Sequence, residues 1–378
     1  MPTAFPTEAP AEAGLVERVA SAPQNLSLSP GSETVSRVVA VPDLQALTWH
    51  GSGSRLVLNT PIGARSYGVA EILGVDGPAA VALSPKGRIH LYAAGRYAYK
   101  DDLSAAWSPP SPAPAGAQPH LVVGPDGYAL LLIVENGILS SYRQSAAGLW
   151  DGPTELGTGV SDYDALPIAN RIVVAATGPE ATTVHLLPGG PVASLEGGQH
   201  INLTYHLNQL LLGIGRTEPP AAYVARSLDQ GEHWATCTVQ TSRYPIESVA
   251  ALPTHQGPYA AFWTWHQPLG PMGAHRYIVF STLQWPIGEA CWTWPDQGQV
   301  DALGEDQDLR IGAPGLVFSR AQQGRFRISH DGAVLAYEGF LQNARETDVF
   351  LISLRRDSLF SGPSRPRPHP GEPGPGGH

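Results

Sequence analysis

The middle of the chain alternates short apolar runs with polar or glycine-containing turns. The clearest runs are five to seven residues long: Ile89–Ala94, Tyr128–Val134, Ile172–Ala176, Leu210–Ile214, Ala260–Trp265 and Ala333–Tyr337. Runs of this length between turn residues are typical of β-strands. Long helices are not expected, because 42 Gly and 36 Pro among 378 residues interrupt nearly every stretch. The pattern predicts an all-β protein.

A glycine or asparagine precedes each run at a regular interval. These residues are Gly87, Gly127, Asn170, Asn208, Gly257 and Gly332, and Gly53 before Leu56-Val57-Leu58 adds a seventh. Both residue types tolerate the positive φ of a tight hairpin. The successive spacings are 34, 40, 43, 38, 49 and 75 residues. A unit of about 40 residues containing several short strands indicates a β-propeller.

Tryptophans form a second series with the same period. Trp107, Trp150 and Trp234 are separated by 43 and 84 residues, and Trp292 or Trp294 would continue the series. A polar turn precedes each of them. We therefore expect an outer hairpin in every unit, near residues 65, 107, 150, 192, 234, 292 and 357.

One of these turns carries a recognisable motif. The segment Ser227-Leu228-Asp229-Gln230-Gly231-Glu232-His233-Trp234 resembles the Asp-box, S-x-D-x-G-x-T-W, of the sialidase-type (BNR) β-propellers, with His233 in place of Thr. Asp229 can accept hydrogen bonds from its own turn, and Gly231 can supply the unusual backbone angle. Asp102 to Trp107 keeps only the Asp and the Trp. The resemblance implies a non-catalytic member of that superfamily in which Ser227, Asp229, Gly231, Trp234, Asp102 and Trp107 are structural.

The periodicity divides the chain into three parts. Residues 1–30 are a low-complexity arm, 31–361 form the propeller, and 362–378 are a Pro/Gly-rich tail without large apolar side chains. We expect about seven four-stranded blades, with six as the alternative because the 75-residue interval can hide a blade or an insertion. Thr34–Val41 is expected to pair with the last blade and close the ring.

Charge and composition exclude several classes of partner. The net charge is −10 and only 2 of 23 basic residues are lysine, so nucleic-acid binding is disfavoured. No apolar run spans a membrane and no secretory signal begins the chain, which favours a cytoplasmic protein or one assembled into a particle. Two cysteines, Cys237 and Cys291, are expected to be free buried thiols.

Strand order separates the two edges of the ring. If the strands of a blade are A to D from the centre outward, short A–B and C–D turns share one edge, the turn edge. The B–C loops and D–A crossovers share the other, the loop edge. Functional residues concentrate on loops held by a rigid scaffold. The ligand-binding candidates on the loop edge are Trp263, Trp265, His266, His275, Arg216, Glu218 and Glu180. Trp263 and Trp265 form either an aromatic platform for sugars or part of the core between blades.

Catalytic motifs are not recovered. The nearest match to the sialidase F/Y-R-I-P motif is Phe326-Arg327-Ile328-Ser329, which lacks the Pro and lies near the C-terminus. Acids available for a glycosidase pair are Asp162, Asp164, Glu180, Glu218 and Glu346. The histidine spacings, such as His200 to His206, match no zinc signature. We assign no catalytic residue, cofactor or metal.

The sequence favours a binding or scaffolding propeller with protein partners at the loop edge or the terminal arms, such as a component of a phage tail, capsid or surface complex. A sialidase-like glycoside hydrolase and a carbohydrate-binding propeller are the alternatives, so glycans remain a possible ligand. Convergence of Arg, Glu and Asp side chains at the central opening would favour the hydrolase.

Overall fold

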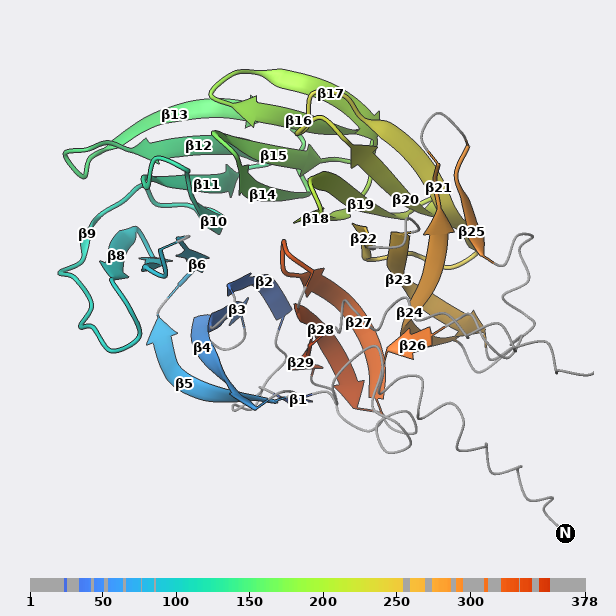
Figure 1. The fold of residues 1–378 in the computed structure, drawn as a ribbon, viewed down its shortest axis with the longest axis horizontal. Helices are drawn as coiled ribbons and strands as arrows, with labels where there is room; N and C mark the ends of the chain where they lie inside the picture. Colours follow the sequence, from blue (N-terminus) through green and yellow to red (C-terminus); the bar gives the residue numbers. More distant parts are fainter. Residues whose placement is uncertain are drawn as a thin grey trace, which may run out of the picture.

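The computed structural model describes residues 24–25, 34–41, 44–50, 54–63, 66–75, 77–84, 86–253, 259–268, 274–286, 290–294, 309–311, 321–332, 334–341 and 347–353. Every regular element among them is a β-strand, and the strands form seven antiparallel sheets. Figure 1 shows these sheets arranged around a common centre. The all-β propeller prediction and the count of about seven blades are confirmed. Among the described residues, no helix is long and apolar enough to cross a membrane.

Blades 1 to 3 follow one another along the chain. Blade 1 contains β2 (Thr34–Val41), β3 (Leu44–His50), β4 (Ser54–Gly63) and β5 (Ser66–Val75). Blade 2 contains β6 (Ala79–Leu83), β7 (Ile89–Ala93), β8 (Arg96–Lys100) and β9 (Ser111–Pro112). Blade 3 contains β10 (Ala117–Val123), β11 (Ala129–Glu135), β12 (Ile138–Gln144) and β13 (Trp150–Gly157).

Blades 4 to 6 repeat the same strand order. Blade 4 contains β14 (Asp162–Ile168), β15 (Arg171–Thr177), β16 (Ala181–Leu187) and β17 (Pro191–Glu196). Blade 5 contains β18 (His200–His206), β19 (Gln209–Thr217), β20 (Pro220–Ser227) and β21 (Ala235–Thr241). Blade 6 contains β22 (Val249–Pro253), β23 (Tyr259–Pro268), β24 (Ala274–Gln284) and β25 (Trp292–Trp294), and β26 (Leu309–Ile311) also pairs with β24.

Blade 7 closes the ring with a strand from the other end of the chain. It contains β27 (Ala321–Ile328), β28 (Val334–Leu341), β29 (Thr347–Ser353) and β1 (Gln24–Asn25), which pairs with β29 as the outermost strand. The expectation that Thr34–Val41 pairs with the last blade is wrong, because this segment is the innermost strand of blade 1. The hairpin expected near residue 357 lies outside the described residues, and β1 takes the fourth place in the blade.

The periodic turn residues mostly join strands A and B, as the spacing predicts. Gly87, Gly127, Asn208 and Gly332 all have positive φ in these turns. Gly53 breaks the series, because the strands on either side of it, β3 and β4, are the second and third of blade 1. Gly53 itself and Gly257 lie outside the described residues.

The apolar residues pack between neighbouring blades. Leu132 and Leu139 of blade 3 share one buried cluster with Tyr163 and Val174 of blade 4. The Tyr163 hydroxyl donates to the Leu132 carbonyl at 3.1 Å. A β-strand presents alternate residues to its two faces, and in a ring of blades both faces are covered. This explains why the runs are nearly continuous apolar segments.

A disulfide joins Cys237 on β21 to Cys291 just before β25, with their Cα atoms 5.9 Å apart. The expectation of two free thiols is therefore wrong. The cysteines are 54 residues apart in sequence, but each lies in the outer part of its blade. Neighbouring outer strands of blades 5 and 6 come side by side, which brings the two sulfurs within bonding distance.

Candidate functional site

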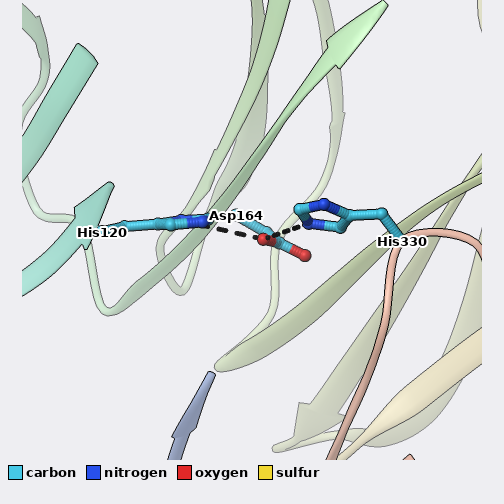
Figure 2. A group of neighbouring side chains, drawn as sticks. All are labelled: His120, Asp164 and His330. Carbon is cyan, nitrogen blue, oxygen red and sulfur yellow. Dashed lines mark hydrogen bonds and ion pairs between the residues drawn. The ribbon is translucent and has the colours of Figure 1, made fainter. Parts of the chain in front are cut away.

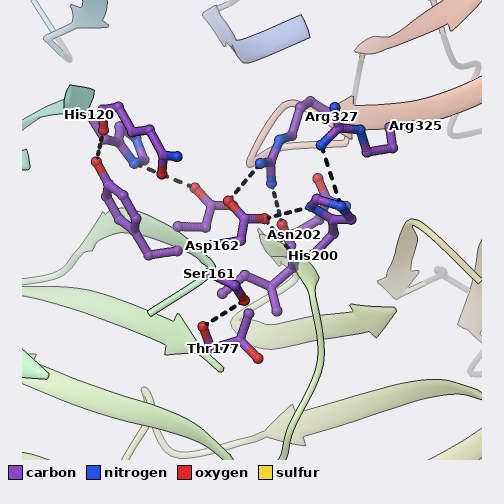
Figure 3. A network of polar contacts seen from close by, with 12 residues as sticks. His120, Ser161, Asp162, Thr177, His200, Asn202, Arg325 and Arg327 are labelled. Atoms are coloured by element: carbon purple, nitrogen blue, oxygen red, sulfur yellow. Dashed lines mark hydrogen bonds and ion pairs between the residues drawn. The ribbon is translucent and has the colours of Figure 1, made fainter. Parts of the chain in front are cut away.

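Polar and charged side chains gather at the centre of the ring, on the innermost strands of four blades and on the A–B turn of blade 7. We call this set the central cluster; it comprises His120, Asp162, Asp164, His200, Asn202, Arg325, Arg327 and His330. Alternate residues of a strand face the same side, which places Asp162 with Asp164, His200 with Asn202, and Arg325 with Arg327. Figure 3 shows most of the cluster converging from separate strands.

Asp162 forms an ion pair across the centre with Arg327. One carboxylate oxygen of Asp162 accepts a hydrogen bond from Arg327 Nη2 at 2.7 Å, and the other accepts one from the backbone N–H of Ile201 at 3.0 Å. His200 Nδ1 lies 3.6 Å from that second oxygen. Arg327 also donates through Nη1 to the Ile201 carbonyl at 2.6 Å. Blade 7 is thereby tied to blades 4 and 5.

Asp164 lies between two imidazoles, as Figure 2 shows. Its Oδ1 is 3.2 Å from His330 Nε2 and 3.8 Å from His120 Nδ1. Its Oδ2 accepts a hydrogen bond from the Leu203 backbone N–H at 2.8 Å. The Asp164 and His120 side chains are almost fully buried, and that of His330 is 22% exposed. The hydrogen bond from Leu203 of blade 5 thus fixes the orientation of the Asp164 carboxylate.

His330 reaches the centre from the A–B turn of blade 7. Ser329 Oγ donates to Asp331 Oδ1 at 2.7 Å, and the Gly332 N–H donates to the Ser329 carbonyl at 2.7 Å. The N–H of Tyr205, on β18, donates to the His330 carbonyl at 2.7 Å. In Figure 1 the β27–β28 hairpin accordingly extends toward β18.

Side chains of the innermost strands also bond to the backbone of the next blade. Asn202 Nδ2 donates to the Val249 carbonyl at 2.9 Å, and Thr204 Oγ1 donates to the Ala251 carbonyl at 2.6 Å. Ser248 Oγ accepts from the Phe326 N–H at 3.1 Å. Buried polar groups of this kind must be hydrogen-bonded to be tolerated. They hold blades 5, 6 and 7 in one arrangement around the centre.

A small cavity of about 40 Å³ adjoins the cluster. Its polar lining residues are His120, Asp164, Asn202, Arg327 and His330, and Leu121 is among the apolar ones. Since one water needs roughly 10–15 Å³ by this measure, the cavity accommodates a few waters or a small ion. It is far smaller than the roughly 300–1,000 Å³ of pockets for larger organic ligands. His120, Asp164 and His330 could hold a metal ion, because one ligand atom of each lies within 4.8 Å of the others.

A second buried histidine lies away from the centre, in blade 2. His90 Nδ1 is 2.6 Å from the Tyr97 hydroxyl. Burial, with a smaller contribution from the positive charge of Arg88, lowers the pKa of His90 to about 4. Burial also raises the pKa of Tyr97 to about 12. Both groups are therefore neutral at pH 7, and the pair is an uncharged buried hydrogen bond.

Of the two roles weighed for Trp263 and Trp265, the structure gives Trp263 the core role and not that of a sugar platform. Its side chain is 2% exposed and packs in the buried cluster between blades 5 and 6. Trp265, His266 and His275 lie on β23 and β24 near their connecting loop. Their side chains are outside the described part of the structure.

The charged candidates Arg216, Glu218 and Glu180 lie at the B–C connections of blades 5 and 4. Arg216 Nε donates to the Glu218 carbonyl at 3.2 Å, and its Nη1 is 3.8 Å from Glu196 Oε2. Glu218 and Glu180 are exposed. Among the described contacts, none joins these three residues to the central cluster.

The Asp-box-like turn lies between β20 and β21, a C–D connection. Asp229 Oδ1 accepts from the His233 N–H at 2.9 Å, and the Gly231 N–H donates to Ser227 Oγ at 2.8 Å. Trp234 Nε1 donates to the Gly231 carbonyl at 2.9 Å. Burial opposes ionisation of Asp229, but hydrogen bonds from His233 and Ser227 outweigh it and lower its pKa.

In the related turn of blade 2, the aspartate also accepts hydrogen bonds from residues of its own turn. Asp102 Oδ1 accepts from Ser104 Oγ at 2.6 Å and from the Ala105 N–H at 2.9 Å. These bonds, that of the Ser104 hydroxyl first, lower the pKa of Asp102. Trp107 lies in the same connection, with Lys100 Nζ 5.1 Å from its ring centre. Asp102 and Asp229 each accept hydrogen bonds from residues of their own turn.

Sequence reasoning missed most of the central cluster. It considered Asp162 and Asp164 only as two acids among five, His200 only by its spacing from His206, and Arg327 only as part of a failed sialidase match. His120 and His330 were not singled out. The available signal was the alternation of polar residues in the strand that precedes each A–B turn, which marks the wall of the central opening.

No protein-family model matches the sequence, and no curated protein matches it. Solved structures match in fold. A chain in the crystal structure of the mitotic checkpoint complex is 12% identical with a TM-score of 0.54, covering 94% of this chain and 99% of that one. A catalytically inactive variant of virginiamycin B lyase from Staphylococcus aureus, with quinupristin, is 10% identical with a TM-score of 0.50, covering 88% and 99%. At these identities the likeness shows the propeller fold alone.

Proposed function

We propose that this protein is a non-catalytic propeller that binds a protein partner through the turn edge of blades 3 to 5. The observation that carries the proposal is where large apolar side chains are exposed. Among the described residues these are Tyr128, Ile138, Leu149, Val192, Leu207 and Leu228. All except Ile138 lie in, or directly beside, A–B and C–D turns of blades 3 to 5. This moves the candidate surface from the loop edge to the turn edge.

Leu149 and Leu228 carry the most weight. They are 68% and 44% exposed, and each lies in a C–D turn, where no packing within the blade requires a leucine. Single exposed apolar residues are ordinary on protein surfaces, but several on one edge of three adjacent blades are typical of an interaction site.

Ion pairs on the same edge match this interpretation. Arg143 pairs with Asp126 on blade 3, and Arg171 of blade 4 pairs with Glu232 of blade 5. Protein interfaces commonly combine apolar contact points with a polar, solvent-accessible surround. The mixture therefore favours a protein partner over a lipid or a nucleic acid.

The centre of the ring supports a binding module over a glycoside hydrolase. Arg and Asp side chains do converge there, as the hydrolase hypothesis requires. However, both oxygens of Asp162 and both of Asp164 already contact protein groups, and the adjoining cavity is only about 40 Å³. A glycosidase needs two carboxyl groups on either side of a sugar ring, for which this cavity leaves no space.

The comparisons add support of a general kind. One structural neighbour is a chain in the structure of the mitotic checkpoint complex, which is consistent with a propeller that binds partners. The other neighbour described above is a lyase, so the fold alone does not distinguish a binding protein from an enzyme. The placement of the exposed leucines supports binding.

The test uses native mass spectrometry on the full chain purified with its partners from the native host. We expect the wild type to carry a partner mass, and the double variant Leu149→Asp/Leu228→Asp to lose it. Ile138→Asp is the control, because Ile138 is also an exposed apolar side chain but lies at the opposite edge, and this variant should retain the partner. Loss in Ile138→Asp alone would place binding at the loop edge. No partner in any sample, or a second copy of this chain as the bound mass, would contradict the proposal.

The assembly role expected of the terminal arms is tested by a truncation that leaves blade 7 complete. Because Gln24–Asn25 is a strand of blade 7, an N-terminal deletion should end before residue 23. If the arms tether the propeller to a particle, deleting residues 1–20 and 362–378 abolishes association while the fold is retained. Unchanged association would assign the contact to the turn edge.

A further inference from the structure

We propose that His120, Asp164 and His330 bind one divalent transition-metal ion of the Zn²⁺ class at the centre of the ring. The three residues come from blades 3, 4 and 7, so the ion would link parts of the chain that are far apart in sequence. The proposal stands independently of partner binding at the turn edge.

The donor set is the first argument. Two imidazole nitrogens and one carboxylate oxygen suit Zn²⁺ and its neighbours in the first transition series. Ca²⁺ and Mg²⁺ prefer sites made of oxygen ligands. The combination therefore selects the metal class without reference to any sequence motif.

The spacing is the second argument. Zn²⁺ bonds nitrogen and oxygen at about 2.0–2.1 Å, which in tetrahedral geometry places ligand atoms about 3.3 Å apart. Asp164 Oδ1 is 3.2 Å from His330 Nε2 and 3.8 Å from His120 Nδ1, and all three ligand atoms lie within 4.8 Å of one another. Side-chain adjustments of less than about 1 Å would complete the geometry.

The support around the ligands is the third argument. The second oxygen of Asp164 accepts the Leu203 N–H at 2.8 Å, which directs Oδ1 toward the imidazoles. The Tyr205 N–H bonds the His330 carbonyl at 2.7 Å and fixes the turn that carries the imidazole. The His120 ring lies 6.0 Å from that of Tyr163. The hydrogen bond from Leu203 to the Asp164 carboxylate is of the kind that characteristically orients metal ligands in proteins.

The cavity supplies the remaining coordination position. Three protein ligands leave a tetrahedral ion with one open site, and the cavity of about 40 Å³ adjoins Asp164 and His330. Arg327 and Asn202 line it as well. A water molecule or a small anion would complete the coordination there, facing one cationic and one amide side chain.

The experiment is calorimetric titration of ZnCl₂ into untagged, chelator-treated full-length protein. We expect one equivalent to bind to the wild type, and binding to weaken by more than about 100-fold in His330→Ala, beyond what loss of an outer-shell contact costs. His233→Ala is the matched control, because His233 also contacts an aspartate, Asp229, but its side chain is 91% exposed. This variant should bind as the wild type does.

Two further readouts keep the result interpretable. CoCl₂ should produce visible absorption bands in the wild type and His233→Ala but not in His330→Ala. Zn²⁺ should raise the melting temperature of the same two proteins only. If His330→Ala does not fold, His330→Gln replaces it.

The proposal is overturned if the wild type binds Zn²⁺ no better than His330→Ala, or if only His233→Ala loses binding. Retention of the partner mass by His330→Ala would show that the metal site and the turn edge are separate. A failure of either proposal is therefore recognised without reference to the other.

Discussion

The ion pair between Arg327 and Asp162 predicts a large and specific loss of stability when it is broken. The Arg327 side chain is 15% exposed and that of Asp162 is 8% exposed, so neither charge is well solvated. Replacing Arg327 with Met retains length and apolar packing but leaves the Asp162 carboxylate without its main countercharge. Removing one partner of a buried ion pair typically costs about 3–5 kcal/mol. We expect Arg327→Met to lower the free energy of unfolding by that amount.

A double-mutant cycle separates this charge effect from packing. Asp162→Asn removes the negative charge, while its side-chain oxygen can still accept the Ile201 N–H. In the Asp162→Asn background, Arg327→Met should therefore cost less, with a coupling energy of at least about 2 kcal/mol. The coupling measures the contact between blades 7 and 4 directly.

The assay is urea unfolding at pH 7, followed by tryptophan fluorescence. Arg171→Met is the control, because Arg171 pairs with Glu232 between blades 4 and 5 with 40% and 44% of the side chains exposed. An exposed pair contributes about 0–1 kcal/mol. A loss of less than about 1 kcal/mol in Arg327→Met, or additive effects in the cycle, would refute the reasoning.

Two further predictions concern the disulfide and a buried histidine. Because the Cys237–Cys291 bond spans 54 residues, replacing both cysteines with Ser should cost about 4 kcal/mol of unfolding free energy; thiols that react with iodoacetamide in unreduced, unfolded protein would contradict the bond. Burial lowers the pKa of His90 to about 4 in the folded protein, from 6.5 for an exposed histidine, so the unfolded chain binds a proton between these pH values that the folded chain does not. Stability should therefore fall by roughly 2 kcal/mol from pH 7 to pH 5. His90→Gln should flatten this dependence in urea unfolding, and an unchanged slope would be inconsistent with a neutral buried His90.

Local features of the sequence were sufficient for the blade pattern. Turns such as those at Gly87 and Gly127 need a positive φ, and a glycine there is visible without knowledge of the fold. The tryptophan turns were visible for a similar reason, since Asp229 and Trp234 bond within their own turn. Interactions within a few residues leave a pattern in the sequence, so the repeat could be predicted.

Contacts between distant parts of the chain leave no such pattern. The closure by Gln24–Asn25 depends on two residues pairing with β29, and two polar residues carry no strand signal. The pairing of Cys237 with Cys291 depends on the curvature of the ring. Two cysteines are too few to suggest a disulfide framework, so the sequence favoured free thiols.

The central cluster could not be predicted from the sequence for the same reason, because its contacts join distant parts of the chain. Asp162 and Asp164 were recognisable as acids, but their roles depend on Arg327 and His330, which follow more than 160 residues later. Only the ring geometry brings blade 7 against blade 4. Trp263 illustrates the opposite case, since an aromatic residue beside a long loop resembled a binding residue but is part of the core.

The central claim is that the turn edge of blades 3 to 5 contacts a protein partner, and site-specific photo-cross-linking tests it most directly. A photoreactive amino acid is placed at position 149 on the turn edge or at position 138 on the loop edge, and the protein is irradiated in its native host. The account predicts a covalent adduct of defined mass from position 149 and none from position 138. An adduct from position 138 alone, or none from position 149, would contradict it.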